Sequence, residues 1–483
     1  MTALPARRFG SSLGAELLGF GAAASAAVAF GALVAIKPAL AVGAVALGGA
    51  VALAWFAPVA NFTLLVFLIA IVPYGLQNQY SLGGAEDSPG LLASDLILTL
   101  GLARAAVSLV QSRLDRRTRI VCVALIAFIG IGALQMLHGM FEGRALNAVG
   151  AEYRVFVVLG GSALIAVSLL IEPDTRRRLL YGMVVLGLAL GLWALIQWTV
   201  DIPLGEEQDV GVREGISQTT SGRGQLQGGL FSFPVAAIMA AAALLSGTIR
   251  SRAGTAVAMT IFVLNLVGLV LTYERTFWVT TALGLLLVAV TMSRRARIRA
   301  LFWGPLALVV FFVVMSTVAP DTLGAARERL LSLGRYESDN SLRFRLTESR
   351  HVVDEIKQSP VFGSGLAASI YWGRPWEGVK PTERTFAHNA YLWLAWKLGL
   401  VGAVLLVGAI LFVLIGRAPP TADPLFKSLR TGAKASLLAL ALTSVTFPAF
   451  TLLAAAAGVG LLIAFSVVPM RWRYPAGARE GEA

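Results

Sequence analysis

The stretch "RTFAHNAYLWLAWKLGLVG", residues 384–402, places a histidine, His388, at the start of a long apolar run. Near neutral pH an imidazole can take a proton from a hydroxyl group, so histidine is the side chain most often used as a general base. The N-terminus of the expected helix adds positive potential there, which disfavours imidazolium and keeps the basic form available. His388 is therefore a candidate base, and a structural or hydrogen-bonding role is the alternative.

Arg275 is the most informative of several basic residues next to apolar runs. In "LTYERTFWVT" it stands with Glu274 between two apolar runs that leave almost no connecting loop. Because charges near hydrocarbon are costly to bury, such residues are functional candidates by default. A tight interfacial hairpin, in which Arg275 reaches lipid phosphates, is the alternative interpretation.

Two further arginines suit the binding of an anion. Arg154 in "GAEYRVFVV" opens an apolar run, and Arg223 in "SGRGQLQGGLFSFP" lies in a glycine-rich stretch before another. An arginine fork binds phosphate oxygens in pairs, so several arginines together would match a diphosphate. An interfacial anchor is the alternative for Arg154, and an ordinary loop residue for Arg223. With His388 the arginines predict a polyanion site with proton transfer nearby.

The sequence offers little for a metal centre. His138 ends an apolar run and His351 has no partner at a metal-ligand spacing, so the three histidines of the chain predict no zinc site. Glu337 and Asp339 in "YESDNS" have the spacing of a metal–diphosphate motif, but helix capping explains them as well. We therefore expect chemistry that uses arginine, with no metal and no cofactor.

The elements that must position these residues are membrane helices. The 483 residues are 57% hydrophobic and only 14% charged, whereas soluble proteins carry about 25% charged residues. Apolar runs close to the roughly 20-residue spanning length recur along the chain. They predict an all-α polytopic membrane protein with twelve to fourteen spans, the shortest of which could be re-entrant. The candidate spans are 17–36, 40–57, 59–76, 91–110, 120–140, 155–171, 179–200, 229–248, 255–273, 276–292, 300–319, 389–415, 432–447 and 449–469.

The basic residues indicate how the spans are oriented. They concentrate in alternate short connections, for example Arg113–Arg119, Arg176–Arg178 and Arg294–Arg299. The positive-inside rule makes these connections and both termini cytoplasmic. The net charge of +13 thus reflects topology rather than nucleic-acid binding. Within the spans, Asp95 is expected to form an interior hydrogen bond and Arg104 to reach the inner face, and a proton-coupling role is the alternative.

One long segment, 320–387, is expected outside the membrane, between N-terminal helices (1–319) and C-terminal helices (388–470) that precede a cytoplasmic tail (471–483). Inside it, "SDNSLRFRLTESRHVVDEIKQSP" predicts an amphipathic helix capped by Asp339 or Asn340 and stopped by Pro360. Its predicted apolar side consists of Leu342, Leu346, Val353 and Ile356. A second face carries Arg343, Arg350 and Lys357.

These motifs together resemble the O-antigen ligase and polymerase superfamily, polytopic membrane glycosyltransferases that use polyprenyl-diphosphate-linked glycans. The resemblance runs from about Arg154 to Gly402, and its most specific part is a proline-then-GxG turn followed by a His-Asn element and two glycines. Those positions are Pro360, Gly363, Gly365, His388, Asn389, Tyr391, Leu392, Gly399 and Gly402. Arg345, fifteen residues before Pro360, stands where the family places an arginine.

The resemblance implies a GT-C-like helical bundle with one large extracytoplasmic helical loop. It implies an inverting, metal-independent transfer of a glycan from a polyprenyl diphosphate to an acceptor hydroxyl on the outer face of a bacterial cytoplasmic (inner) membrane. His388 and Arg275 would be catalytic. Substrate-binding residues would be Arg154, Arg223, Arg345, Asn389 and Tyr391. The partners implied are the lipid-linked glycan donor, a glycolipid, polysaccharide or protein acceptor, and membrane lipids, with no nucleic acid.

The sequence departs from the family pattern at three places. No asparagine follows Pro234, Ser349 stands where a tryptophan is frequent, and Glu274 precedes Arg275 in place of a small hydroxyl residue. Two enzymes remain open, a ligase and a polymerase that extends a lipid-linked polysaccharide. The long loop and the His-Asn element favour the ligase. A transporter of lipid-linked sugars is the alternative from another class, although its expected internal symmetry is absent from the sequence.

Overall fold

The computed structural model describes residues 38–72, 90–199, 229–249, 251–272, 274–318, 340–374, 379–417 and 423–469, with Gly324 and Thr421 as isolated positions. Within these residues the chain forms fourteen helices and one pair of strands, which confirms the all-α polytopic class expected from the composition. Contacts divide the chain into two units, residues 1–57 and 58–483. The first unit contains helix α2 (Pro38–Phe56).

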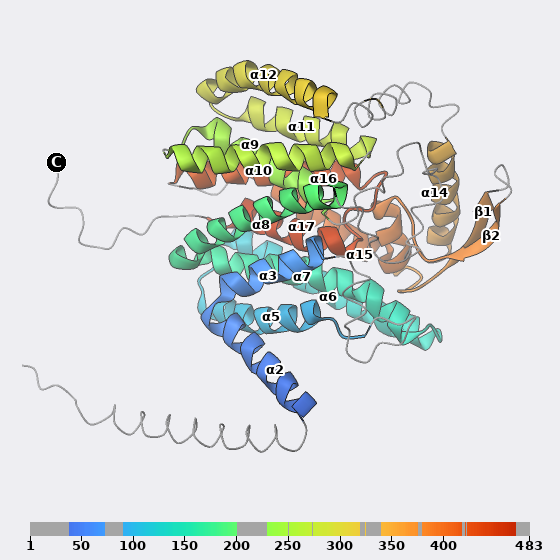
Figure 1. The fold of residues 1–483 in the computed structure, drawn as a ribbon. Coiled ribbons are helices and arrows are strands. Elements are labelled where there is room, and N and C mark those ends of the chain that lie inside the picture. The colour runs from blue at the N-terminus through green and yellow to red at the C-terminus, as the bar shows by residue number, and fades with distance from the viewer. Residues whose placement is uncertain are drawn as a thin grey trace, which may run out of the picture. The chain divides into compact units, whose positions relative to one another are not determined.

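The second unit contains the remaining elements. Figure 1 shows most of its helices side by side in a bundle, with α14 and the two strands at one end. The elements are α3 (Pro58–Ala70), α5 (Ala93–Gln111), α6 (Arg116–Phe141), α7 (Leu146–Ile171), α8 (Pro173–Thr199), α9 (Ser232–Ser246), α10 (Arg252–Leu271), α11 (Arg275–Thr291), α12 (Arg294–Val318), α14 (Asn340–Gln358), β1 (Ile370–Arg374), β2 (Val379–Arg384), α15 (Ala390–Ile415), α16 (Pro424–Thr443) and α17 (Leu453–Val467).

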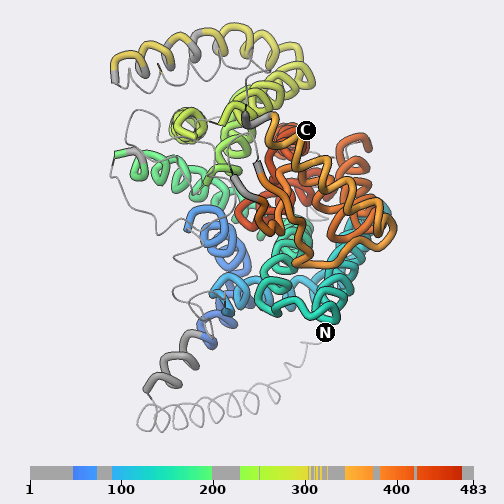
Figure 2. The backbone as a smooth tube through the Cα atoms, turned by 90° about the vertical axis from the view of Figure 1, so that its right-hand side faces the viewer, coloured from blue at the N-terminus to red at the C-terminus, as the bar shows by residue number. Residues whose placement is uncertain are grey.

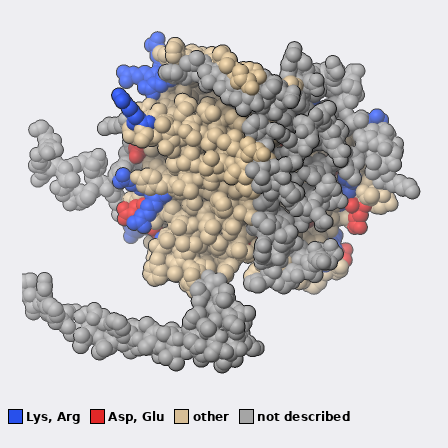
Figure 3. Space-filling model, viewed as in Figure 1, with Lys and Arg blue, Asp and Glu red and all other residues tan. Residues whose placement is uncertain are grey.

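Fewer helices than the predicted twelve to fourteen satisfy the length and apolarity needed to cross a membrane. Among the described residues these are α5, α6, α7, α8, α10 and α15, or seven spans if α2 and α3 together form one. Helices α9, α11 and α17 are apolar but shorter. The predicted span 17–36 lies outside the described residues. Figure 3 shows a broad uncharged surface with lysine and arginine gathered at one edge, as expected for helices that face lipid.

Polar residues directly before apolar runs determine where several helices begin. Asp115, Ser251, Asn389 and Asp423 each accept hydrogen bonds from backbone N–H groups in the first turn of α6, α10, α15 and α16. Such caps satisfy N–H groups that have no partner inside the helix. The cap at Asn389 fixes the start of α15 and therefore the position of His388, the residue before it.

The core of the second unit is centred on α7. Most of this helix is buried, and it packs against α17, α6 and α5. The approach to α17 is close, because a Cβ atom added at Gly460 would lie 2.6 Å from the backbone of Leu159 and Ala163. Small residues allow such contact between membrane helices. Close packing of α7 therefore fixes the positions of the charged residues near its N-terminal end, Glu152 and Arg154.

The amphipathic helix expected in segment 320–387 is present as α14, but its buried side differs from the prediction. Phe344, Glu348 and Val352 are buried, whereas Leu346 is 55% exposed. The buried residues are four apart and share one face. This face is selected by tertiary contacts, since the Phe344 ring lies 4.9 Å from that of Trp372. The predicted basic face of Arg343, Arg350 and Lys357 is exposed.

The same segment also contains an antiparallel β-hairpin, which was not predicted. Strand β1 pairs with β2 in a register that aligns Ile370 with Arg384 and Trp372 with Thr382. Ile370 and Trp372 are buried while Tyr371 between them is 73% exposed, the alternation of a strand with one covered face. Figure 2 shows residues 340–374 and 379–384, in orange, in front of helices α6, α7 and α15 in this view. The segment is thus a helix with a hairpin rather than helical throughout.

Candidate functional site

The surroundings of His388 are formed by α14 and the start of α15. The His388 side chain is 7% exposed, and the rings of Phe344 and Phe386 meet the imidazole edge-on at 5.3 and 5.4 Å between centroids. The backbone N–H of His388 donates to Glu348 Oε2 at 2.7 Å. Its Nδ1 atom lies 3.1 Å from both carboxylate oxygens of Glu348. One buried carboxylate therefore holds both the backbone and the ring of His388.

This contact determines which ring nitrogen is available for chemistry. A carboxylate oxygen accepts hydrogen bonds, so the contact favours the tautomer of His388 that has its N–H group on Nδ1. In that tautomer Nε2 carries the lone pair. Within the described residues, the hydrogen bonds of His388 involve its backbone N–H and Nδ1, and none of them involves Nε2. The arrangement can accept a proton from a group placed at Nε2.

No motif in the sequence marks Glu348, which lies forty residues before His388. A polar residue on a helix with an apolar side is usually expected in solvent. The side chain of Glu348 is nevertheless only 2% exposed. Burial of a carboxylate is tolerated where hydrogen bonds replace water, and His388 supplies those bonds.

The proline-then-GxG turn contacts α15 through backbone hydrogen bonds. The chain kinks at Gly399, whose φ of 68° and ψ of 176° are not helical. The amide of Leu400 donates to the carbonyl of Pro360 at 2.9 Å, and the amide of Gly365 donates to that of Lys397 at 3.2 Å. A Cβ atom at Gly363 would lie 2.3 Å from the amide nitrogen of Gly399. The two glycine motifs of the sequence are therefore the two sides of one backbone contact.

A second buried carboxylate fixes the same turn. Glu152 of α7 accepts from Lys397 Nζ at 2.9 Å and from the amide of Ala367 at 2.7 Å. Lys397 Nζ also donates to the carbonyl of Ala368 and lies 4.2 Å from the centre of the Trp396 ring. The sequence does contain a signal for this pair, since Lys397 interrupts an apolar run.

The first residues of α11 and of α15 both form hydrogen bonds with the short segment that follows α16. Thr276, the neighbour of Arg275, lies with its Oγ1 atom 3.3 Å from Thr446 Oγ1. The amide of Ala390, two residues after His388, donates to the carbonyl of Ser444 at 2.9 Å. Residues 275 and 388 are thus positioned by the same short segment of chain. The structure thus brings a near neighbour of each predicted catalytic residue, Thr276 and Ala390, to the segment 444–446.

Arg154 is already engaged by an acidic residue. Its Nε atom lies 2.9 Å from Asp95 Oδ1, and its Nη2 atom donates to the carbonyl of Gly90 at 3.0 Å. Asp95 thus has the interior partner expected for it. Arg104 pairs instead with Glu172 at 3.3 Å. The charge of Arg154 is largely balanced, so a phosphate at this position would have to share the guanidinium with Asp95.

Two other predicted binding residues have structural contacts. Asn389 Oδ1 accepts from the amides of Tyr391 and Leu392 at 3.0 and 3.1 Å, which leaves only its amide N–H₂ group for a ligand. The hydroxyl of Tyr391 donates to the carbonyl of Ala441 at 2.7 Å. Arg345 precedes Glu348 by three residues on α14 and so lies on the neighbouring part of its surface. Arg223 lies outside the described residues.

The described residues contain no group of three or more metal-binding side chains. His138 contacts Gln135 and Glu142, at 3.2 and 3.8 Å. The ring of His351 stacks on Trp372. The acidic pair Glu337 and Asp339 falls outside the described part of the chain. These contacts give His138 and His351 ordinary roles at the protein surface.

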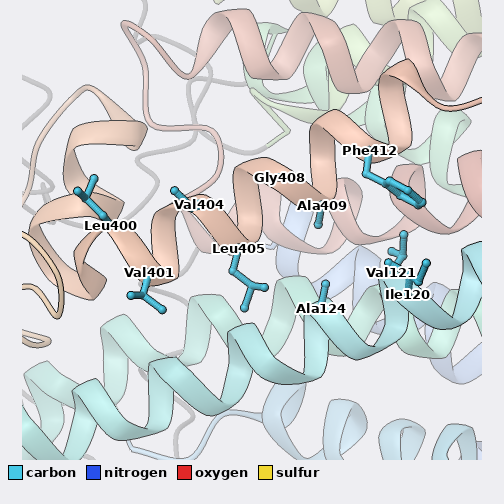
Figure 4. A pocket seen from close by; sticks show the side chains of 10 residues that line it. All are labelled: Ile120, Val121, Ala124, Leu400, Val401, Val404, Leu405, Gly408, Ala409 and Phe412. Carbon is cyan, nitrogen blue, oxygen red and sulfur yellow. The ribbon is translucent and has the colours of Figure 1, made fainter.

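A groove of about 630 Å³ between α6 and α15 lies apart from these charged residues (Figure 4). Its lining includes Ile120, Val121 and Ala124 of α6 and Leu400, Leu405 and Phe412 of α15. None of its lining side chains is titratable. The groove can hold an apolar chain, but its lining offers no group for acid–base chemistry.

Comparison with protein families agrees with the resemblance described above. Residues 260–407 match the family model of the O-antigen ligases. The matched segment includes Arg275, Arg345, Glu348, the proline-then-GxG turn, His388 and Gly399. The comparison with curated proteins finds no match to the chain. The resemblance is thus confirmed for residues 260–407, which are less than half of the chain.

Proposed function

We propose that this chain, which carries an O-antigen ligase domain at residues 260–407, transfers a glycan from a polyprenyl-diphosphate carrier to an acceptor hydroxyl. The family match and the apolar helices support a multi-pass membrane protein of the O-antigen ligase and polymerase type. The observation that carries the finer assignment is the contact between Glu348 and His388 Nδ1, which leaves Nε2 for an acceptor. The reaction takes place at the outer face of the cytoplasmic membrane.

In the proposed reaction the acceptor hydroxyl gives its proton to Nε2 of His388 as its oxygen attacks the anomeric carbon. The bond from that carbon to the carrier's diphosphate breaks, and its electrons leave on the diphosphate. Attack from the side opposite the leaving group inverts the anomeric configuration. General-base assistance of this kind contributes about 10²–10⁴-fold to a rate.

The departing diphosphate needs compensation for its negative charge. Arg275 is proposed for this role, which is supported by the contact of its neighbour Thr276 with Thr446, close to the Ser444 carbonyl that holds the start of α15. Arg223 and Arg345 are proposed as further contacts to the donor. Arg154, whose charge is shared with Asp95, is proposed to orient the diphosphate rather than to neutralise its charge. Preorganised cations stabilise developing charge without a metal ion. The amide group of Asn389 and the ring of Tyr391 border the acceptor side.

The proposal is tested in proteoliposomes that contain a polyprenyl-diphosphate-linked glycan and envelope acceptors, with release of the lipid diphosphate as the readout. His388→Gln removes the base but retains a donor for Glu348, and Arg275→Ala removes the cation. His351→Gln is the matched control, because His351 is exposed and contacts Trp372. We expect both site variants to lose about 10²-fold or more of the rate, with EDTA without effect and the control active.

The products distinguish the remaining alternatives. Glycan attached to a different acceptor indicates a ligase, and a longer lipid-linked glycan indicates a polymerase. Glycan that crosses the bilayer while still joined to its lipid would contradict a transferase and favour transport. Site variants that match an active wild type would contradict the roles given to His388 and Arg275.

A further inference from the structure

We infer that Glu348 is a positioning residue that sets the tautomer and orientation of His388, so that the base of the membrane site is completed by helix α14. The effect of Glu348 on catalysis rests on the proposed function, in which His388 is the base. The geometry that carries it is the pair of contacts from one carboxylate to the backbone N–H and to Nδ1 of His388, at 2.7 and 3.1 Å.

The contacts of Glu348 exclude a direct role as the base. Both of its oxygens face His388, and its side chain is only 2% exposed. A general base must lie within hydrogen-bond reach of the acceptor hydroxyl. The enclosed carboxylate cannot meet this requirement without leaving His388. Glu348 therefore acts through the imidazole.

The same contacts give the carboxylate a defined effect on proton transfer. A neutral histidine exists as two tautomers, and a carboxylate at Nδ1 selects the one with its lone pair on Nε2. When Nε2 takes the acceptor proton, the ring becomes a cation that stays in contact with the carboxylate. In the serine hydrolases a carboxylate with this role is worth about 10⁴-fold in kcat, because its amide replacement favours the wrong tautomer.

The contact between Glu348 and His388 is buried, so it can form only when α14 packs against the start of α15. The Phe344 ring, one turn before Glu348, packs edge-on against the imidazole at 5.3 Å, and Phe386 covers another edge at 5.4 Å. A carboxylate among these rings is unfavourable unless it is hydrogen-bonded. His388 supplies two donors to it. The helix and the base therefore stabilise each other, although they lie on separate elements.

Two variants separate positioning from simple stabilisation. Glu348→Gln keeps the size of the side chain and can accept one hydrogen bond, but it presents an N–H₂ group where the second oxygen stood. Glu348→Asp keeps the charge with a shorter reach. Glu355→Gln is the matched control, because this substitution on the same helix affects only a 3.4 Å contact with Gln358 among the described residues.

The first readout is the ¹⁵N NMR spectrum of the three histidines in the folded, substrate-free protein, with His388 assigned by its loss in His388→Gln. We expect the Nδ1–H tautomer of His388 in the wild type and in Glu355→Gln. Glu348→Gln should lose this tautomer preference, whereas Glu348→Asp should keep it. An Nε2–H tautomer in the wild type, or a spectrum unchanged in Glu348→Gln, overturns the inference.

The second readout is the rate of lipid-diphosphate release. Glu348→Gln should lower kcat by about 10²-fold or more with little change in KM, and Glu348→Asp should recover part of it. If Glu348→Gln does not fold, the Asp variant decides: wild-type kcat with an altered tautomer contradicts the positioning role. An inactive wild type with the expected tautomer refutes the proposed function and leaves the tautomer assignment intact.

Discussion

The pairs Glu348–His388 and Glu152–Lys397 both join a buried carboxylate to a basic residue in the segment that begins α15. In each pair the two side chains are at most 16% exposed. Lys397 uses its ammonium group on Glu152, on the carbonyl of Ala368 and on the ring of Trp396. His388 uses only its backbone N–H and Nδ1 on Glu348.

The two pairs differ in which hydrogen-bonding atoms remain available to another molecule. Both oxygens of Glu152 accept from donors within the protein, and the Lys397 side chain is 0% exposed. That pair attaches the chain at Ala367 and Ala368 to α7 and α15. In the histidine pair the hydrogen bonds involve the backbone N–H and Nδ1 of His388, and none involves Nε2 within the described residues. The two pairs therefore differ in whether a ring or ammonium nitrogen remains for another molecule.

Breaking the lysine pair should give the largest loss of stability. In Lys397→Met the carboxylate of Glu152 stays buried without its cation, so the free energy of unfolding should fall by about 3–5 kcal/mol. The change is measured by thermal unfolding in detergent. Adding Glu152→Gln, which still accepts from Ala367, should recover much of the loss. A Lys397→Met protein as stable as the wild type would contradict a structural role for the pair.

A second loss of stability is expected at the kink at Gly399, where α15 meets the proline-then-GxG turn. Gly399→Ala would place a methyl group 2.1 Å from the carbonyl oxygen of Val361, at a φ of 68°. The strained backbone alone should cost about 1–3 kcal/mol. Gly408→Ala is the control on the same helix, because an added Cβ meets open space there. The kink would be dispensable if both alanine variants unfolded at the same temperature.

The smallest effect is expected on the exposed side of α14. The hydrogen bond from Lys357 to Asp354 lowers the pKa of this carboxyl below its ordinary value of 3.8. A lowered folded-state pKa stabilises the protein above that ordinary value, and the stabilisation is lost as the pH falls through the folded pKa. Solvent screening makes such a pair weak.

Asp354→Asn should therefore leave the unfolding midpoint and the transfer rate nearly unchanged at neutral pH. Any difference from the wild type should disappear in strong acid and in high salt. Thermal unfolding at several pH values measures it. A large loss of activity in this variant would show that the exposed face of α14 also belongs to the site, which would weaken the contrast with Glu348.

Features determined by local residue order were predictable from the sequence. The apolar runs indicated membrane helices, Pro360 marked the end of α14 and the His-Asn element marked the start of α15. These features depend on length, caps and breakers, which act over a few residues. Among the described residues six helices, or seven with the bent pair, are long and apolar enough to span a membrane, and several other apolar runs form shorter helices.

Features that depend on distant pairing were not predictable. Glu348 and His388 meet across forty residues, and Glu152 meets Lys397 across an even longer separation. The side of α14 that is buried was chosen by the hairpin and by His388, so the hydrophobic pattern alone selected Leu346 incorrectly. The glycines could be recognised as a motif in the sequence. Why glycine is needed there, namely a close backbone contact between two segments far apart in the chain, is visible only in the folded structure.

The most direct test of the central claim is a single-turnover measurement of lipid-diphosphate release by His388→Ala, with and without added imidazole. The truncation removes the base and opens space beside Glu348 that free imidazole can occupy. We expect release to fall by about 10²-fold or more and to recover in part as imidazole is added. Release at the wild-type rate without imidazole would contradict His388 as the base.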